Sequence, residues 1–223
     1  MKLLRIYLIS AFLMCTLGIF AQDSTHVAYS FNYEFVDGIY LNFNQFKNNS
    51  PIQSEAIILK NTEYDASDLF DYIENSKEIS YYNELGNLNT IAVKKLWGYC
   101  KNGRPHVYFS QGFWQIPFIG SICHFVANIT VYYDYNPSMY YDPYYYHRMP
   151  HGRHTTEIFQ MLIDMETGVL TDFNVENVAI LLQRDKDLSE EFNSLRKRKK
   201  RNMIFYYIRM YNQKHPLYMP IKN

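Results

Sequence analysis

The chain has 223 residues, of which 48% are hydrophobic and 17% aromatic, and its formal net charge is 0. A neutral chain has no overall field that would attract nucleic acid, so its composition argues against a nucleic-acid-binding protein. The aromatic share favours strands, because Tyr, Phe and Trp pack well on a pleated surface.

Residues 1–21 have the plan of a secretory signal peptide. Lys2 and Arg5 precede an uncharged apolar stretch, Ile6 to Phe20, and Ala21 offers a small residue for cleavage. A membrane anchor is the alternative, but the apolar stretch is shorter than the roughly 20 residues that a span needs. A lipoprotein would need a small residue before Cys15, where Met14 stands. We expect residues 22–223 to form the secreted mature chain, with no further transmembrane segment.

The residues after this segment read as short strands joined by local turns. Asn42 or Asn44 is expected to cap a short helical turn, and residues 66–76 fit either a short helix capped by Ser67 or a strand. The sequence NELGN, the dipeptide Asn102-Gly103 and the dipeptide Gln111-Gly112 are typical of hairpin turns. They predict an antiparallel meander over residues 77–135.

A further hairpin is predicted over residues 155–173, with Gly168 at the position that needs positive φ. Asn174 then has the chemistry of a helix N-cap. Apolar residues at three- and four-residue spacing predict a helix after it and a second helical region up to Pro216, as one long helix or as two joined near Lys200.

The order of these elements predicts an α+β fold, in which an antiparallel, meander-rich β-sheet is followed by C-terminal helices. We expect a sheet of roughly six to ten strands packed against the helices. Residues 22–223 would form a single domain that is β-rich over 30–172 and helical over 174–214.

Four stretches of the chain resemble a family of secreted proteins of Bacteroidetes-type bacteria that has no assigned activity. The stretches are Asp37–Ile52, Leu96–Phe109, Ile116–Phe125 and Tyr211–Pro220. The context of the expected cleavage site, FAQ, is similar as well. The resemblance implies an exported bacterial protein of the periplasm or outer surface, and it implies no catalytic residue.

Cys100 and Cys123 remain in the mature chain. In an oxidising compartment they could form a disulfide, or both could be small buried apolar residues. Without a pair of histidines at ligand spacing, they make a poor zinc site.

Aromatic residues gather in two places that could form a recognition surface. Tyrosine offers contact area and a hydroxyl group with few rotatable bonds, and Pro137, Pro143 and Pro150 favour an extended loop around one of these groups. The alternative is that the tyrosines cover a face of the sheet. The candidate binding residues are Phe113, Trp114, Tyr140, Tyr141, Tyr144, Tyr145 and Tyr146.

The sequence RKRKKR is the strongest charge feature of the chain. It could contact an anionic surface such as lipid headgroups or polyanionic glycans, or it could be a solvated helix face. Its residues are Arg196, Lys197, Arg198, Lys199, Lys200 and Arg201.

Catalytic and metal-binding patterns are weak. His147, His151 and His154 lie near Asp134 and Asp142, but Pro150 breaks the helical spacing that would bring the histidines together, so no metal site is expected. Ser110, His124 and Asp134, or a cysteine beside His106 or His124, lack a motif that would activate a nucleophile. The acidic group Asp185 to Glu191 falls on an expected solvated helix rather than at paired strand ends.

These observations favour a non-catalytic interaction or ligand-binding module of the cell envelope, with a glycan or an envelope protein as partner and no cofactor. The alternative function is a hydrolase whose site is assembled only in three dimensions. A third possibility, a subunit of an envelope assembly, predicts an exposed apolar patch on the helices.

Overall fold

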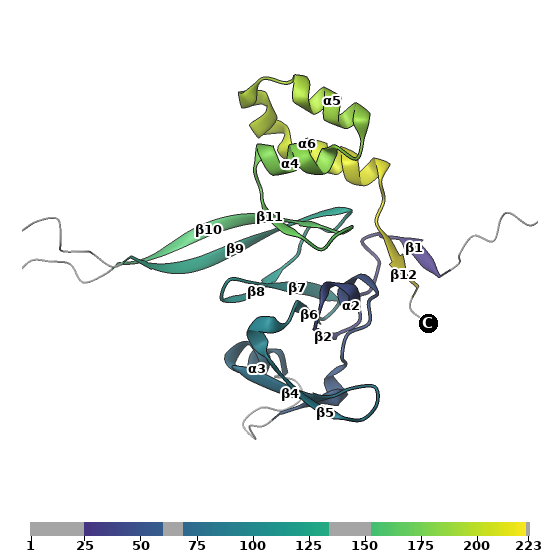
Figure 1. The fold of residues 1–223 in the computed structure, drawn as a ribbon, viewed down its shortest axis with the longest axis vertical. Helices are drawn as coiled ribbons and strands as arrows, with labels where there is room; N and C mark the ends of the chain where they lie inside the picture. The colour runs from purple at the N-terminus through teal and green to yellow at the C-terminus, as the bar shows by residue number, and fades with distance from the viewer. Residues whose placement is uncertain (1–24, 60–68, 134–152, 222–223) are drawn as a thin grey trace, which may run out of the picture.

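The computed structural model describes residues 25–59, 69–133 and 153–221 of the chain (Figure 1). The expected signal peptide, residues 1–21, lies outside these ranges. The described residues contain twelve strands and five α-helices, in agreement with the expected α+β fold of antiparallel strands followed by helices. The strands are β1 (His26–Ala28), β2 (Gly38–Tyr40), β3 (Ile57–Ile58), β4 (Glu78–Tyr82), β5 (Leu88–Ala92), β6 (Gly98–Lys101), β7 (Arg104–Phe109), β8 (Gly112–Gln115), β9 (Ile122–Tyr133), β10 (Arg153–Asp164), β11 (Leu170–Asp172) and β12 (Tyr218–Pro220). The helices are α2 (Phe43–Lys47), α3 (Leu69–Asn75), α4 (Val175–Leu182), α5 (Lys186–Ser194) and α6 (Lys197–Lys214), with short 3-10 turns η2 (Ser54–Ala56) and η4 (Val93–Lys95).

The strands form four small antiparallel sheets instead of the one sheet of the sequence-based expectation. Their orders are β1-β12, β11-β10-β9, β2-β6-β7-β8 and β3-β4-β5. Most strands have six residues or fewer. In Figure 1 helices α4, α5 and α6 lie above the β9–β11 sheet, with the β2-β6-β7-β8 and β3-β4-β5 sheets below it.

One short strand at the C-terminus lies outside the expected order of strands first and helices last. After α6 ends and Pro216 prevents its continuation, residues Tyr218–Pro220 return as β12 and pair with β1. The β-rich part therefore extends beyond residues 30–172 at both ends of the chain, and it also includes the short helices α2 and α3.

The predicted hairpin turns are present, with one shift. Asn102 and Gly103 have φ angles of 54° and 69°, as the turn between β6 and β7 requires, and Gly168 has φ 78° before β11. The turn between β7 and β8 begins one residue earlier than expected, because Ser110 takes the positive φ of 59° and Gly112 already starts β8.

The local caps also follow the sequence. Asn42 caps α2 by accepting a hydrogen bond from the Gln45 N–H, and Asn174 caps α4 by accepting one from the Asn177 N–H. The stretch that fitted either a helix or a strand is helix α3; Ser67 lies outside the described residues.

The second helical region is two helices that meet at Leu195 and Arg196, not near Lys200. Both residues have extended backbone angles, which interrupts the helical hydrogen bonds. The buried side chains of α4, α5 and α6 pack together over Ile122 and Leu162 of the β9–β10 ribbon. Among the described residues, no helix is both long enough and apolar enough to cross a membrane.

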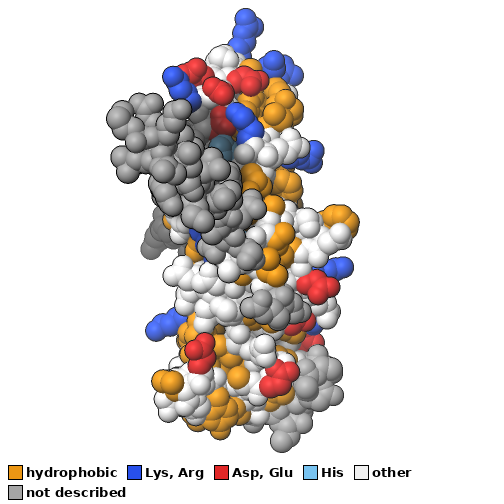
Figure 2. Space-filling view, turned by 90° about the vertical axis from the view of Figure 1, so that its right-hand side faces the viewer, with side chains coloured by type: hydrophobic (Ala, Val, Ile, Leu, Met, Phe, Trp, Pro, Cys, Tyr) orange, Lys and Arg blue, Asp and Glu red, His pale blue; other side chains and the backbone are white. Residues whose placement is uncertain are grey.

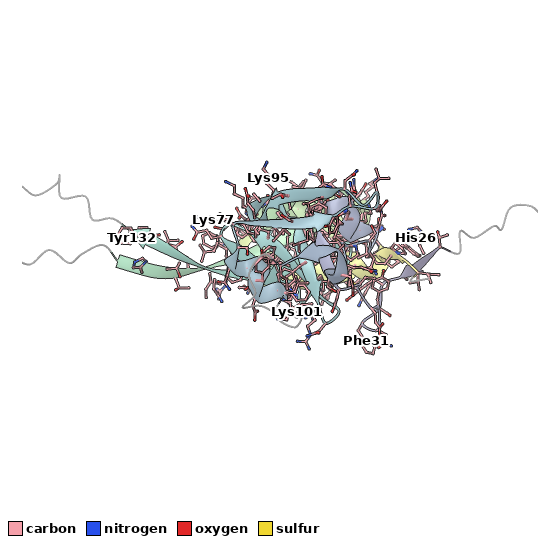
Figure 3. All side chains as sticks on the ribbon, turned by 90° about the horizontal axis from the view of Figure 1, so that it is seen from below. His26, Phe31, Lys77, Lys95, Lys101 and Tyr132 are labelled. Carbon is pink, nitrogen blue, oxygen red and sulfur yellow. The ribbon has the colours of Figure 1, made fainter. Side chains whose placement is uncertain are left out.

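Strands β9 and β10 form a two-stranded ribbon of twelve residues on each side. Residues Cys123, Phe125 and Ala127 point into one core and Ile122 into the helical core, since successive side chains alternate between faces. The outer part of the ribbon projects from the body (Figure 1). Tyr132 on this ribbon and His26 on β1 lie on opposite sides of the molecule when it is seen from below (Figure 3).

Cys100 and Cys123 are free, buried thiols in this structure, so of the two alternatives from the sequence they form buried side chains and no disulfide. The Cys100 Sγ donates to Asp37 Oδ1 at 3.4 Å, and the Cys123 Sγ donates to the Gly120 carbonyl at 3.3 Å. The two sulfur atoms thus have different partners on different elements.

Candidate functional site

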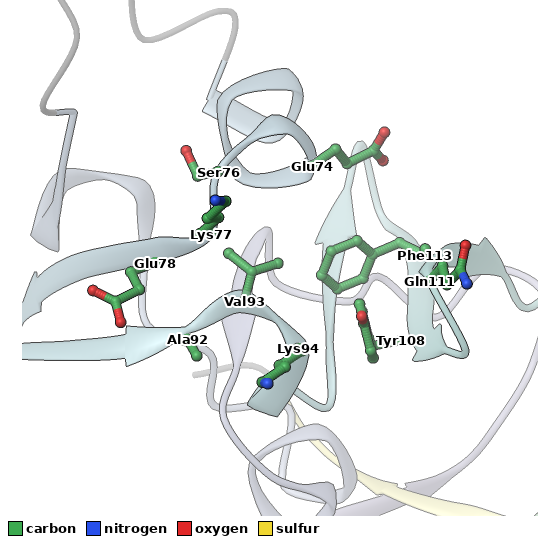
Figure 4. Close-up of a pocket in the computed structure, with 11 residues that line it drawn as sticks. Glu74, Ser76, Lys77, Glu78, Ala92, Val93, Lys94, Tyr108, Gln111 and Phe113 are labelled. Carbon is green, nitrogen blue, oxygen red and sulfur yellow. The ribbon is translucent and has the colours of Figure 1, made fainter.

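A hollow of about 690 Å³ lies between the β7–β8 hairpin and the β4–β5 hairpin, beside the end of α3 (Figure 4). This volume is in the range of sites that hold a small ligand. Its lining combines aromatic, charged and amide side chains: Glu74, Ser76, Lys77, Glu78, Ala92, Val93, Lys94, Tyr108, Gln111, Gly112 and Phe113.

Two half-buried aromatic rings form the apolar part of the hollow. Tyr108 on β7 and Phe113 on β8 are direct cross-strand partners, and their rings meet edge to face with centroids 5.1 Å apart. In Figure 4 the Phe113 ring projects towards Val93, with Tyr108 beside it. Ring surface at an open hollow can stack on a flat apolar part of a ligand.

Tyr99 supports these rings from the neighbouring strand β6. Its ring lies 4.8 Å from Phe113, 4.7 Å from His106 and 4.9 Å from Phe70, measured between centroids. Tyr99 is itself buried. The aromatic surface of the hollow is therefore fixed by packing before any ligand arrives, which lowers the entropic cost of binding.

The Tyr99 hydroxyl donates a hydrogen bond of 2.5 Å to Glu74 Oε1. Burial raises the pKa of Tyr99 far above its usual value, and the hydrogen bond to Glu74 adds to this effect. Tyr99 is therefore a neutral phenol at physiological pH. It orients the Glu74 carboxylate at the edge of the hollow and joins α3 to the sheet.

The rim carries charges of both signs. Glu78 begins β4 and Lys77 precedes it. Lys94 comes from η4, Glu74 from α3, and Gln111 from the β7–β8 turn. Alternating charges give no net field that would select a strong anion or cation. They do offer donors and acceptors on several sides of a polar, uncharged ligand.

The two aromatic residues that the sequence grouped together at this turn point in opposite directions. Phe113 lines the hollow, whereas Trp114 packs against the core that contains Phe125, and its Nε1 donates to the Phe109 carbonyl at 3.1 Å. Adjacent residues of a strand face opposite sides. Phe113 and Trp114 therefore lie on opposite faces of β8, and of the two only Phe113 lines the hollow.

The other predicted aromatic residues, Tyr140, Tyr141, Tyr144, Tyr145 and Tyr146, lie outside the described residues, as do Asp134, Asp142, His147 and His151. His154 is described on β10, where its ring lies 4.9 Å from that of Tyr132. No group of three metal-ligating side chains occurs in the part of the chain that the structure describes.

The basic run lies at the start of α6. Arg196 is its N-cap residue, with a side chain that makes no capping hydrogen bond, and Lys197 to Arg201 form the first turns. Lys200 Nζ donates a hydrogen bond to Asn193 Oδ1 and makes a cation–π contact with the Phe192 ring. The other five side chains are exposed.

Among the described residues, no hydrogen bond joins Ser110, Cys100 or Cys123 to a histidine. Buried His124 hydrogen-bonds to Gln160 and packs between Phe173 and Phe205, and burial lowers its pKa. Burial also raises the pKa of Cys123 to about 12 and that of Cys100 far above its usual value. Neither thiol has the lowered pKa of a reactive cysteine.

The acidic group Asp185 to Glu191 is not uniformly solvated as expected. Asp185 is buried, caps α5 through the Leu188 N–H, and accepts from Lys214 Nζ at 2.9 Å and His215 Nε2 at 2.8 Å. The Leu188 N–H, followed by Lys214 and His215, lowers the pKa of Asp185 far below its usual value. This cluster joins the start of α5 to the end of α6.

Sequence analysis missed most residues of the hollow, including Tyr108, Glu74 and Lys94. Tyr108 stands two residues from His106 on one strand, which places both on one face. No spacing in the sequence relates these residues to Glu74 or Lys94, because a packed sheet and helix bring them together.

A scan against protein-family models, a search of curated proteins and a search of solved structures each found no match to this chain.

Proposed function

We propose that this chain is an exported protein of the bacterial cell envelope that binds a saccharide in the hollow over Tyr108 and Phe113 without altering it. The export rests on the sequence of residues 1–21, with Lys2 and Arg5 before an apolar stretch that ends at Ala21.

The observation that carries the saccharide is the half-buried ring pair of Tyr108 and Phe113 inside a polar, mixed-charge rim. A sugar ring has one face of C–H groups, which can stack on an aromatic ring. Its hydroxyl groups point outwards around that face. They need donors such as Lys77 and Lys94 and acceptors such as Glu74, which the rim provides.

The experiment begins with a glycan array that selects a saccharide and continues with titration calorimetry on variants. Phe113→Leu keeps an apolar side chain but removes the ring, whereas Phe113→Tyr keeps the ring. We expect Phe113→Leu to weaken binding and Phe113→Tyr to retain it. Tyr132→Leu, which changes a ring on the projecting ribbon, is the control and should bind as wild type does.

Deleting residues 140–146 separates this site from the tyrosine-rich stretch predicted as a binding surface. Binding at the hollow should survive the deletion, and its loss would move the site to that stretch. Intact protein should also release no reducing ends from the selected saccharide. Hydrolysis that disappears in Glu74→Gln or Glu78→Gln would instead establish the alternative function, since both carboxylates line the hollow.

Export is tested on the protein itself. Mass spectrometry of the protein recovered from the periplasm or the medium should give Gln22 as the first residue. An intact residue 1 on protein that remains in the cytoplasm would contradict the proposal.

A further inference from the structure

The charge of this neutral chain is segregated between two parts. Residues 184–215 contain ten lysines and arginines and four acidic residues, which gives a net charge of +6. The rest of the chain has twelve basic and eighteen acidic residues, a net charge of −6. The cationic segment comprises α5, α6 and the residues next to them.

Helix α6 supplies most of this positive charge and contains no acidic residue over its eighteen positions. Arg196, Lys197, Arg198, Lys199 and Arg201 are exposed, and no ion pair joins any of them to another described residue. Because they lie at the N-terminal end of the helix, they also oppose its dipole. Helix stability therefore does not account for their position.

The exposed positive charge of α6 extends beyond its first turns. Arg209 continues the exposed positive surface, and at 1.5 Å per residue it lies roughly 20 Å along the axis from Arg196. Tyr206, on the turns between, is 49% exposed, whereas the Phe205 ring packs on His124 and Phe173. Cations and aromatic rings on one exposed helix are typical of surfaces that lie at a lipid headgroup layer.

The helical layer occupies one end of the long axis of the molecule (Figure 1), where a flat surface can approach it. Figure 2 shows several Lys and Arg side chains at this end, with acidic side chains between them. The acidic residues Asp187, Glu190 and Glu191 belong to α5, and part of their charge is offset by Lys186 and Lys214.

We propose that the exposed face of α6 docks on an anionic lipid surface. Phosphate groups of the headgroups would neutralise the five unpaired cations, and Tyr206 would lie at the headgroup level. The acidic remainder of the chain would be held away from the surface, which fixes the orientation of the molecule. This contact is independent of the hollow between the β7–β8 and β4–β5 hairpins.

The test is co-sedimentation of the mature chain with vesicles. The vesicles contain phosphatidylcholine alone or with about 30% phosphatidylglycerol, at about 0.1 M and about 1 M salt. We expect binding to the anionic vesicles at low salt, and its loss at high salt and on neutral vesicles. Arg198→Gln/Lys199→Gln/Arg201→Gln should weaken binding on the order of 100-fold, because each cation near such a surface increases the affinity about five-fold.

The matched control is Lys47→Gln/Lys95→Gln/Arg104→Gln, which removes the same charge from other elements and should leave binding unchanged. The α6 variant should unfold at the same temperature as wild type or a higher one, since it removes cations from a helix N-terminus. Equal weakening by both variants would overturn the proposal. So would equal binding to neutral vesicles, or a basic face already covered in a stable dimer that ignores vesicles. We expect millimolar inorganic phosphate to weaken vesicle binding only as much as other salt of the same ionic strength does. A stronger effect of phosphate would show that the face binds free phosphate instead.

Discussion

Arg184 grips Asp164 with two hydrogen bonds, from Nη1 to Oδ1 at 2.8 Å and from Nη2 to Oδ2 at 2.7 Å. Asp164 is the last residue of the long strand β10, and Arg184 lies just after the end of α4. The pair therefore fastens the helical layer to the sheet at the turn that leads to β11. Arg184 Nε also contacts Glu166 Oε2 at 3.0 Å.

Replacing Arg184 by Ala is expected to lower the free energy of unfolding by about 2–3 kcal/mol, because Asp164 would remain buried without its cation. The Asp164 contacts with Thr167 and the Glu166 N–H remain and limit the loss. Urea denaturation measures the effect. Lys186→Ala, which removes an exposed pair with Glu190, should change stability by less than about 0.5 kcal/mol. Equal effects of the two changes would show that the Arg184 pair has no special role.

The same pair predicts how stability depends on acid. Burial acts to raise the pKa of Asp164, but hydrogen bonds from Arg184, Thr167 and the Glu166 N–H outweigh it and lower the pKa to about 2. A carboxyl group with a lowered pKa in the folded state stabilises the protein above its unfolded pKa of roughly 4. This contribution is lost as the pH falls from about 4 through about 2.

Allowing for solvent around the half-exposed Arg184, the contribution from Asp164 is about 1–2 kcal/mol. Unfolding measured between pH 6 and pH 2, values chosen to bracket this titration, should show a smaller decrease for Asp164→Asn than for wild type. A parallel decrease in both proteins would contradict the assignment.

The cysteines give a prediction about reactivity. Both thiols are buried and have raised pKa values, so the native protein should not react with a thiol reagent at neutral pH. After denaturation without reductant, a chain cleaved after Ala21 should show two reactive thiols, Cys100 and Cys123. Absence of reactive thiols after denaturation would mean that a disulfide joins them. A third thiol would be Cys15 of an uncleaved chain.

The opposite faces of β8 predict opposite effects at two adjacent residues. Trp114→Leu should destabilise the protein by about 2 kcal/mol, because the indole packs on the core and its N–H donates to Phe109. Its effect on saccharide binding should be small. Phe113→Leu should weaken saccharide binding, since its ring lines the hollow, and should lower stability less than Trp114→Leu does. Denaturation curves and binding titrations on both variants, compared directly, measure the contrast.

The local structure of this chain could be predicted where a single turn or cap determines it. Local turns and caps depend only on residues a few positions away, so they can be read from a short stretch of sequence. The examples are Asn102-Gly103, Gly168, Asn42 and Asn174. The return of the chain as β12 could not be predicted, because its partner β1 lies at the other end of the chain.

The candidate site depends on such distant pairings even more. Phe113 was predicted as a binding residue, but its ring becomes part of a hollow only where β7, η4 and the end of α3 meet. Trp114 is also aromatic and follows Phe113 directly, but the alternation of side chains along β8 places it against the core. The alternative of two helices joined near Lys200 puts their junction too far along the chain, since the extended residues are Leu195 and Arg196. The charged residues after Leu195 contain no Gly or Pro that would mark this junction in the sequence.

The central claim is that the ring of Phe113 stacks on a saccharide. The most direct test is the ratio of two dissociation constants, those of Phe113→Leu and Phe113→Tyr, for the saccharide that the array selects. Stacking predicts that the leucine variant binds about 3- to 10-fold more weakly than the tyrosine variant. Equal dissociation constants for the two variants would contradict the proposed site.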